Sequence, residues 1–280
     1  MQIDLDHLKN WIGREDQASE ELTSSLVVRF NATFDRRSAT DHGAEAPLFI
    51  HLCLGQPAVP TAELGPDGHP ARGGFLPPVP LPRRMWAGGA VEFHAPIKIG
   101  DVVTRRSVIE DVTVKHGRSG ALCFVTVRHH VSSGGRSALT ERQDIVYRDV
   151  TRKTSAAIGP APDKAPRGAH SMDVAASAPF LFRYSALTFN GHRIHYDAPY
   201  AQNEESYPGL VIHGPIQATM LCQFAADLRG TAPKEFHFRS LAPIFGPEAF
   251  TLNAESGGDA LKLWTAQAGG PVSMEATAKW

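Results

Sequence analysis

An apolar stripe late in the chain restricts the possible folds more than any other feature. Within residues 213–229, apolar side chains recur every four positions: Ile216, Met220, Phe224 and Leu228. Pro215 stands at the start, where the first turn of a helix tolerates proline. Four stretches of strand-like composition follow, over residues 235–242, 249–254, 261–266 and 272–278. The pattern predicts a helix of roughly four turns packed on an antiparallel sheet, an α+β architecture.

The first half of the chain repeats this order of elements. Residues 5–12 and 20–30 have helical spacing, with Ser19 as a candidate N-cap, and residues 47–55 predict a short buried helix between a proline and a glycine. Residues 102–115 and 121–131 are rich in β-branched side chains and predict a hairpin around a turn at 116–120, and residues 143–150 predict a third strand. We therefore expect two similar halves, residues 1–150 and 179–280.

The segments between these elements are less regular. Residues 57–82 contain eight of the 21 prolines, which predicts a long loop, either a lid or a surface excursion. Residues 151–178 are rich in alanine, proline and serine and predict a linker between the halves. Residues 180–185 have the composition of a strand.

Composition excludes several classes of protein. Lys and Arg number 28 and Asp and Glu 29, so no basic excess favours nucleic acid as a partner. No apolar run approaches the roughly 18 residues of a membrane helix. The three cysteines form no CxxC pair, which argues against a disulfide framework or a zinc ribbon. Because the start lacks an apolar signal-peptide core, we expect a cytoplasmic protein without a membrane partner.

A polar cluster precedes the long helix and carries the candidate chemistry. Residues 188–197 contain Asn190, His192, His195 and Asp197. A histidine suits proton transfer near neutral pH, and the amide of Gly214 at the helix start suits developing negative charge. The alternative, a polar loop whose side chains satisfy backbone groups, stays open. His192, His195 and His213 offer metal donors, but without a matching motif such as HExxH we predict no metal.

The chain resembles a known family at two segments. Residues 183–197 (RYSALTFNGHRIHYD) and 207–215 (YPGLVIHGP) resemble the active-site region of MaoC-like hot-dog hydratases and dehydratases. On this register Thr188 takes the place of the family's serine, Asn190 that of its aspartate and His195 that of its histidine. Asn190 departs from the wider family because an amide cannot take up a proton. A subgroup carries the same change, namely the mesaconyl-C4-CoA/itaconyl-CoA hydratases and the mitochondrial-type 3-hydroxyacyl-thioester dehydratases. Residues 81–89 and 115–120 also resemble this subgroup.

The resemblance implies a tandem hot-dog fold, in which each half is a helix wrapped by an antiparallel sheet. It implies a non-catalytic first half that helps to bind the acyl-CoA and a catalytic second half. The implied reaction is reversible addition of water to the α,β double bond of a CoA thioester. A small branched dicarboxylyl ester is favoured, and a fatty 3-hydroxyacyl thioester is the alternative.

The resemblance also implies roles for individual residues. His195 is the expected base, Asn190 holds the water and Gly214 binds the thioester oxygen. The candidate substrate- or CoA-binding residues are Arg84, Arg183, His192 and Asp197. A free substrate carboxylate would need a cationic partner, for which the candidates are Arg84, Arg183, Arg193 and Arg239. Asp197 has a simple alternative role as a backbone cap. CoA is part of the substrate, so no cofactor is expected, and the fold allows a homodimer.

Two rivals remain, a hot-dog acyl-CoA thioesterase and a non-catalytic acyl-CoA-binding protein. A thioesterase normally needs a carboxylate as nucleophile or base, and the polar cluster offers only Asp197. A binding protein would hold its ligand without turnover.

Overall fold

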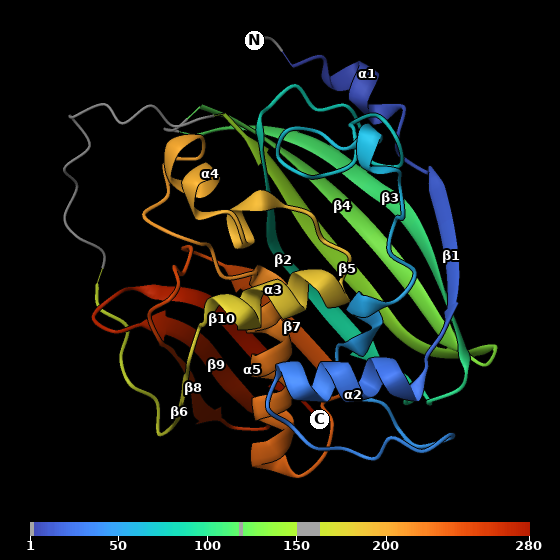
Figure 1. The fold of residues 1–280 in the computed structure, drawn as a ribbon, viewed down its shortest axis with the longest axis vertical. Coiled ribbons are helices and arrows are strands. Elements are labelled where there is room, and N and C mark those ends of the chain that lie inside the picture. The colour runs from blue at the N-terminus through green and yellow to red at the C-terminus, as the bar shows by residue number, and fades with distance from the viewer. Residues whose placement is uncertain (1–2, 118–119, 150–162) are drawn as a thin grey trace.

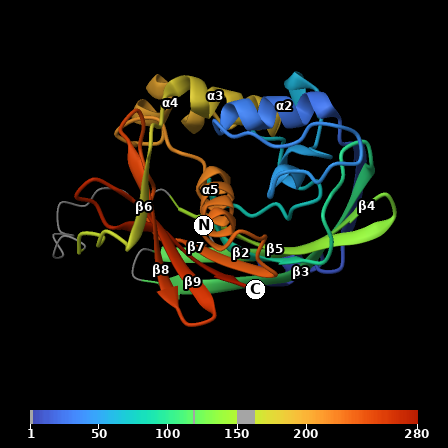
Figure 2. The same cartoon turned by 90° about the horizontal axis from the view of Figure 1, so that it is seen from below.

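One antiparallel sheet forms a complete layer of the molecule, and helices α2 to α5 lie on one side of it (Figures 1 and 2). The computed structural model describes residues 3–117, 120–149 and 163–280. Within these residues the sheet has ten strands in the order β1-β3-β4-β5-β2-β7-β10-β9-β8-β6. The first five belong to the N-terminal half of the chain and the last five to the C-terminal half.

The N-terminal half contributes the longer strands. These are β1 (Glu15–Glu21), β2 (Arg83–Phe93), β3 (Val102–Gly117), β4 (Gly120–Ser133) and β5 (Arg136–Arg148). The predicted hairpin is confirmed as β3 and β4, whose register runs from Val103 opposite Ser133 to Gly117 opposite Gly120. Two residues of its turn, 118 and 119, lie outside the described residues. The third predicted strand, 143–150, is the second half of β5.

The C-terminal half contributes β6 (His170–Val174), β7 (Glu235–Ser240), β8 (Phe250–Gly257), β9 (Ala260–Gln267) and β10 (Val272–Lys279). The four predicted strands are confirmed as β7 to β10. Strand β6 was missed, and it lies inside the segment predicted as a linker. It is an edge strand paired with β8, and only Val174 of its side chains is buried, so it has no apolar periodicity to reveal it. Residues 151–162 of the predicted linker lie outside the described residues.

Strands β2 and β7 join the two halves into one sheet. Their register places Gly88 opposite Arg239 and Gly89 opposite Phe238. A Cβ atom on Gly88 would lie 2.7 Å from the carbonyl oxygen of Phe238, and one on Gly89 would lie 2.7 Å from the Phe238 ring. Only glycine therefore fits at these two positions where the halves meet, next to the bulge that β2 forms against β5 between Trp86 and Gly88.

The predicted long helix is confirmed as α5 (Gly214–Arg229), which ends at Gly230 in the left-handed conformation with φ 79°. It packs against the C-terminal strands β7 to β10. The buried helix expected at 47–55 is one turn of 3₁₀ helix, η1 (Ile50–Cys53). Residues 57–82 contain only the 3₁₀ turn η2 (Thr61–Glu63). The long-loop prediction is therefore confirmed.

Two local predictions need correction. The helix expected over 20–30 is present as α2 (Ser24–Thr33), but its predicted start and its Ser19 cap are wrong. Thr23 is the cap and accepts a hydrogen bond from the Leu26 amide at 3.2 Å, and the residues before it end strand β1. Ser19 pairs with Thr104 in the sheet. The short helix α1 (Leu5–Lys9) lies within the 5–12 prediction.

The strand expected over 180–185 is also wrong, because this segment is helix α3 (Ala178–Leu187). Ser177 caps the helix by accepting from the Phe180 amide at 3.3 Å, and a proline lies in its first turn. The aromatic residues that suggested a strand instead pack against α2. Phe34 meets Phe180 and Tyr184 edge-on at ring separations of 5.7 and 5.8 Å.

The largest hydrophobic core draws on both halves. It contains Phe30 of α2 and Val91 of β2 together with Leu221 of α5 and Phe236 of β7, all at most 1% exposed. Helices α2 and α3 lie side by side above it (Figure 2). In the described part of the chain, no helix has the length and apolar character needed to span a bilayer.

Candidate active site

The loop between α3 and α4 (Ala198–Asn203) carries the predicted catalytic residues. Phe189 reverses the chain in the left-handed region with φ 48°, and the Asn190 amide then donates to the carbonyl of Ser185 at 2.8 Å. The loop continues into the 3₁₀ turn η3 (Arg193–His195). At that end, the Val211 amide donates to Ile194 at 2.9 Å. Backbone hydrogen bonds therefore fix the loop between α3 and the start of α5.

His195 is buried and held in one tautomer. Its Nδ1–H donates to the carbonyl of Val211 at 2.7 Å, which leaves Nε2 with a free lone pair. The side chain is 7% exposed, and burial lowers its pKa to about 4, although the Val211 hydrogen bond acts the other way. His195 is therefore neutral at pH 7 and able to accept a proton at Nε2.

His213 stacks on His195. Their ring centroids lie 3.6 Å apart with planes 16° from parallel, and His213 Nε2 is 2.9 Å from the hydroxyl of Ser185. Burial lowers the pKa of His213 well below its ordinary value, and the neighbouring His195 adds to this. His213 therefore packs as a neutral ring behind the base. The position of His213 in the sequence, directly before α5, did not indicate that its ring would stack on His195.

Asn190 and His192 form a tight turn. The Asn190 side-chain oxygen accepts from the His192 amide at 3.1 Å, so the amide nitrogen of Asn190 keeps its two donor hydrogens. The His192 ring meets the His195 ring edge-on at 5.3 Å. Burial, His69 and His195 together lower the pKa of His192 to about 2. Both residues thus lie on the loop that carries His195.

Gly214 is the first residue of α5. His213 provides no side-chain cap, so the first amides of the helix have no partner within it. A Cβ atom at Gly214 would lie 3.2 Å from the ring of Trp86 and 3.8 Å from Ser240 Oγ. Trp86 belongs to the 81–89 segment of the first half. The helix start therefore lies where the two halves meet.

The carboxylate of Asp197 is fully engaged within the protein. It caps α4 by accepting from the Tyr200 amide at 3.1 Å and pairs with Arg193 at 2.8 Å. The cap and the arginine together lower the pKa of Asp197. These contacts match the capping role weighed from the sequence, and they also engage Arg193.

The other candidate arginines are widely separated. Arg183 is exposed on α3 and donates to the carbonyl of Ala32 at 3.4 Å. Arg239 pairs with Glu275 at 3.2 Å, and its side chain is 69% exposed. Arg84, by contrast, lines a small cavity with His192. Of these three arginines, only Arg84 shares a cavity with a residue of the catalytic loop.

Sequence reasoning missed Asp67 and His69. They lie in the proline-rich loop, and the His69 ring is 4.1 Å from that of His192. His69 Nδ1 lies 3.0 Å from a carboxylate oxygen of Asp67. The pairing of an acid with a histidine two residues later was the only local signal, and nothing in it indicated a contact more than 120 residues along the chain.

Asp67, His69 and His192 also bring three donor atoms within 4.8 Å of one another. Such a set has the composition of a metal site. However, Arg84 faces both histidines and its positive charge opposes a cation there. The His192–His195–His213 set considered above fits no better, because the nitrogens of two stacked rings cannot converge on one ion.

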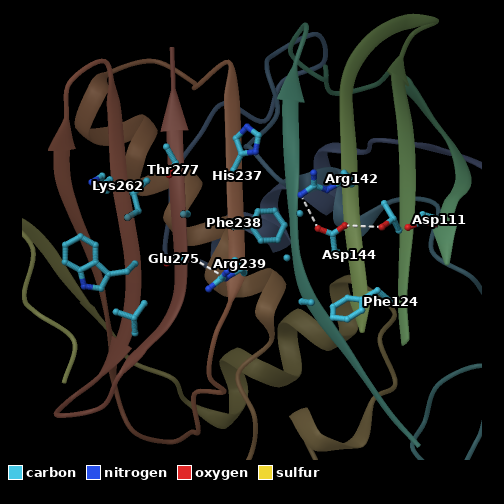
Figure 3. Close-up of a pocket in the computed structure, with 18 of the residues that line it drawn as sticks. Asp111, Phe124, Arg142, Asp144, His237, Phe238, Arg239, Lys262, Glu275 and Thr277 are labelled. Atoms are coloured by element: carbon cyan, nitrogen blue, oxygen red, sulfur yellow. Dashed lines mark hydrogen bonds and ion pairs between the residues drawn. The ribbon is translucent and has the colours of Figure 1, made fainter. Parts of the chain in front are cut away.

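A larger hollow of about 960 Å³ lies over the strands on either side of the β2–β7 junction (Figure 3). Its walls carry ion pairs between Arg239 and Glu275 and between Arg142 and Asp144. Neither His195 nor Gly214 lines it. This hollow is therefore separate from the candidate active site.

Comparison with known proteins identifies the family. A family model described as hydroxyacyl-thioester dehydratase type 2 matches residues 49–246. A mesaconyl-C(4)-CoA hydratase of Chloroflexus aurantiacus is 41% identical over 271 residues, which cover 95% of each chain. The matched range includes the proline-rich loop, β2 and the catalytic loop.

Solved structures agree on the fold. A MaoC-like dehydratase of Phytophthora capsici superposes with a TM-score of 0.71 at 14% identity, covering 99% of this chain and 98% of that one. A Mycobacterium tuberculosis protein described as a double hot-dog superposes with a TM-score of 0.58 at 13% identity, covering 95% of each chain. The α+β double hot-dog prediction is thus confirmed, and the chain belongs to the hydroxyacyl-thioester dehydratase type 2 family.

Proposed function

We propose that this protein is an acyl-CoA hydratase, and that its substrate is a small branched dicarboxylyl-CoA of the mesaconyl-C4-CoA type. The observation that carries the proposal is His195, a buried neutral histidine whose Nε2 is left as an acceptor and whose ring stacks on His213, the residue directly before α5. The 41% identity to a mesaconyl-C(4)-CoA hydratase supports the choice of substrate.

The proposed reaction begins with water attacking the β-carbon of the enoyl thioester. His195 Nε2 takes the proton from the water as the carbon–oxygen bond forms. The electron pair of the double bond moves onto the thioester oxygen as an enolate. Gly214 N–H, at the positive end of α5, stabilises that charge. His195 then returns the proton to the α-carbon, so water is added and the base is restored.

Asn190 has a supporting role in this scheme. Its oxygen is occupied by the His192 amide, and its Nδ2 hydrogens hold the attacking water by donating to the water oxygen. An amide cannot take up the second proton that the wider family's aspartate could. The scheme therefore assigns both proton transfers to His195. It uses no cofactor, since CoA is part of the substrate.

The direct test follows the absorbance of the conjugated enoyl thioester. Purified protein is mixed separately with mesaconyl-C4-CoA, crotonyl-CoA and a long-chain enoyl-CoA. Rapid loss with the branched dicarboxylyl ester supports the proposal. Rapid loss only with the plain esters would instead assign a 3-hydroxyacyl-thioester dehydratase. Release of free thiol would indicate a thioesterase, and binding without turnover an acyl-CoA-binding protein.

A variant tests the role of the base. His195→Ala should lower kcat by roughly 10²–10⁴, the usual contribution of a general base. A folded His195→Ala protein with near wild-type turnover would end the mechanism. The homodimer that the sequence allows stays a prediction, which size-exclusion chromatography would measure.

A further inference from the structure

The proline-rich loop of the first half is docked onto the catalytic loop of the second. The Arg193 amide donates to the carbonyl of Asp67 at 2.9 Å, and the Arg193 guanidinium donates to that of Pro66 at 3.0 Å. Gly68 and Gly191 touch backbone to backbone, so that a Cβ on Gly191 would lie 2.6 Å from the Gly68 oxygen. These contacts fix the loop against the catalytic residues.

This docking orients His69. Asp67 binds it twice, accepting from the His69 backbone amide at 3.0 Å and lying 3.0 Å from Nδ1 of the ring. With Nδ1–H donating to the carboxylate, Nε2 is the atom left for a ligand. The His69 ring packs on that of His192 at 4.1 Å. An acid thus holds a histidine in place beside the catalytic loop.

Arg84 adds a cation next to this pair. It lines a cavity of about 30 Å³, enough for a water or a carboxylate group but not for an acyl chain, whose walls also include Asp67, His192 and Glu205. His69 lies beside this cavity, packed against His192. Arg84 is hydrogen-bonded to Tyr147, which is 1% exposed. Among the residues that the structure describes, Arg84 forms no salt bridge. Its neighbour Arg83, in contrast, pairs with Glu205 at 3.1 Å.

The chemistry of a dicarboxylyl ester sets a strict requirement on such a cation. In mesaconyl-C4-CoA the free carboxylate is attached to the β-carbon, the atom that receives the hydroxyl group. A group that binds the carboxylate must therefore lie next to the group that activates water. The Arg84 cavity meets this requirement, because His192 lines the cavity and the His192 ring lies 5.3 Å from that of His195.

We propose that Arg84 and His69 bind the free carboxylate of the substrate, with Asp67 positioning His69, and that this subsite selects dicarboxylyl-CoA esters. The inference deepens the proposed function and rests on it. It assigns the proline-rich loop a direct part in substrate recognition. It also explains why Arg84, rather than Arg183 or Arg239, is the relevant cation.

The charges of the subsite balance when a carboxylate enters. Asp67, Glu205 and the substrate carboxylate supply three negative charges, and Arg83, Arg84 and protonated His69 supply three positive ones. In the free protein, burial and the nearby Arg84 and Arg72 lower the pKa of His69, although Asp67 opposes them. Neutral His192 also faces the ring. A bound carboxylate reverses the balance, so its binding should be accompanied by proton uptake.

The experiment compares two esters that differ only at the proposed contact. Mesaconyl-C4-CoA carries a carboxylate where 3-methylcrotonyl-CoA carries a methyl group. Arg84→Met should lower kcat/KM for mesaconyl-C4-CoA roughly 10- to 100-fold, as expected for a lost hydrogen bond between charged groups, and change the rate with the methyl ester by less than about threefold. His69→Gln should act in the same direction. Arg239→Met is the matched control, because Arg239 is exposed, pairs with Glu275 and does not line the Arg84 cavity.

A binding assay makes the test independent of turnover. Succinyl-CoA and butyryl-CoA are saturated and differ in the same way, a carboxylate against a methyl group. Wild-type protein should bind succinyl-CoA more tightly and with proton uptake, seen by calorimetry in buffers of different ionisation enthalpy. Arg84→Met should abolish that preference, and Arg84→Lys should restore part of it. Circular dichroism establishes that each variant is folded.

Three results would overturn the inference. The first is a folded Arg84→Met protein that loses kcat/KM or affinity equally for the carboxylate ester and the methyl ester of a pair. The second is an Arg84→Met protein that keeps the wild-type preference for succinyl-CoA over butyryl-CoA. The third is a wild-type protein that has no such preference. Failure of the proposed function looks different, because the wild-type protein would then hydrate none of the enoyl esters or only the plain ones. The succinyl-CoA preference would still report on Arg84 in that case.

Discussion

Acidification should act on His195 at an unusually low pH. Burial lowers its pKa to about 4, whereas an exposed histidine titrates near ~6.5. Since the proposed base works in its neutral form, kcat/KM for an ester without a free carboxylate, such as 3-methylcrotonyl-CoA, should stay level from about pH 8 down to about pH 5 and fall only near pH 4. A plain histidine base would already lose most of its activity at about pH 5.5.

The same shift predicts an effect on stability. The unfolded chain binds a proton at His195 below pH ~6.5, but the folded chain does so only near pH 4. Stability from neutral His195 is therefore fully present above pH ~6.5 and is lost as the pH falls toward 4. The gap between the two pKa values is worth roughly 3 kcal/mol, of which about 2.5 kcal/mol is lost by about pH 4.5.

The assay is urea unfolding of the wild-type protein and of His195→Gln, each at about pH 7.5 and about pH 4.5. Glutamine does not titrate, so the difference between the two proteins isolates this group from the other buried histidines. We expect the wild-type protein to lose about 2–3 kcal/mol more than the variant. Equal losses of unfolding free energy in the two proteins, or a fall of kcat/KM that begins already near pH 6.5, would refute the reasoning.

Three further substitutions test the site and the fold. Asn190→Asp removes the donor hydrogens and adds a negative charge. It should therefore lower kcat about tenfold or more and raise the pH at which kcat/KM falls on acidification. Wild-type kcat with an unchanged pH profile would contradict this. In Gly68→Ala, at φ 86°, the added Cβ would overlap the carbonyl oxygen of Gly191 and separate the loop of residues 57–82 from the catalytic loop. This should lower kcat/KM by up to roughly 10²-fold. A wild-type kcat/KM would show that the contact between the loops is dispensable. Ser177→Ala removes the α3 cap and should lower the free energy of unfolding by ~1 kcal/mol and Tm by about 2–4 °C, with activity unchanged. An unaltered Tm would contradict the capping role of Ser177 toward Phe180.

Short-range patterns allowed much of the fold to be predicted. The α5 stripe and strands β3, β4 and β7 to β10 are readable because their side chains follow the period of the element they form. Where the pattern was weak, prediction failed. Strand β6 buries only Val174, and α3 contains aromatic residues, which have a high propensity for β-strands.

The candidate site divides along the same line. Asn190, His192 and His195 lie within six positions of one another, so the sequence alone indicated that they share a loop. The protonation states of the two histidines could not be predicted, because burial sets both and the hydrogen bond that His195 donates to the Val211 carbonyl fixes its tautomer. The pKa of about 4 for His195 is a property of its surroundings.

The sequence by itself thus determined the two hot-dog halves, the long helix and the loop that carries the proposed base. The tertiary structure alone decided which distant groups meet that loop. It stacked His213 on His195, brought Asp67 and His69 to His192, and left Arg183 on the surface beside α2. The physical reason is that periodicity reports only which face of an element is buried. Contacts across more than 100 residues depend on how the two halves join and where the loop of residues 57–82 docks.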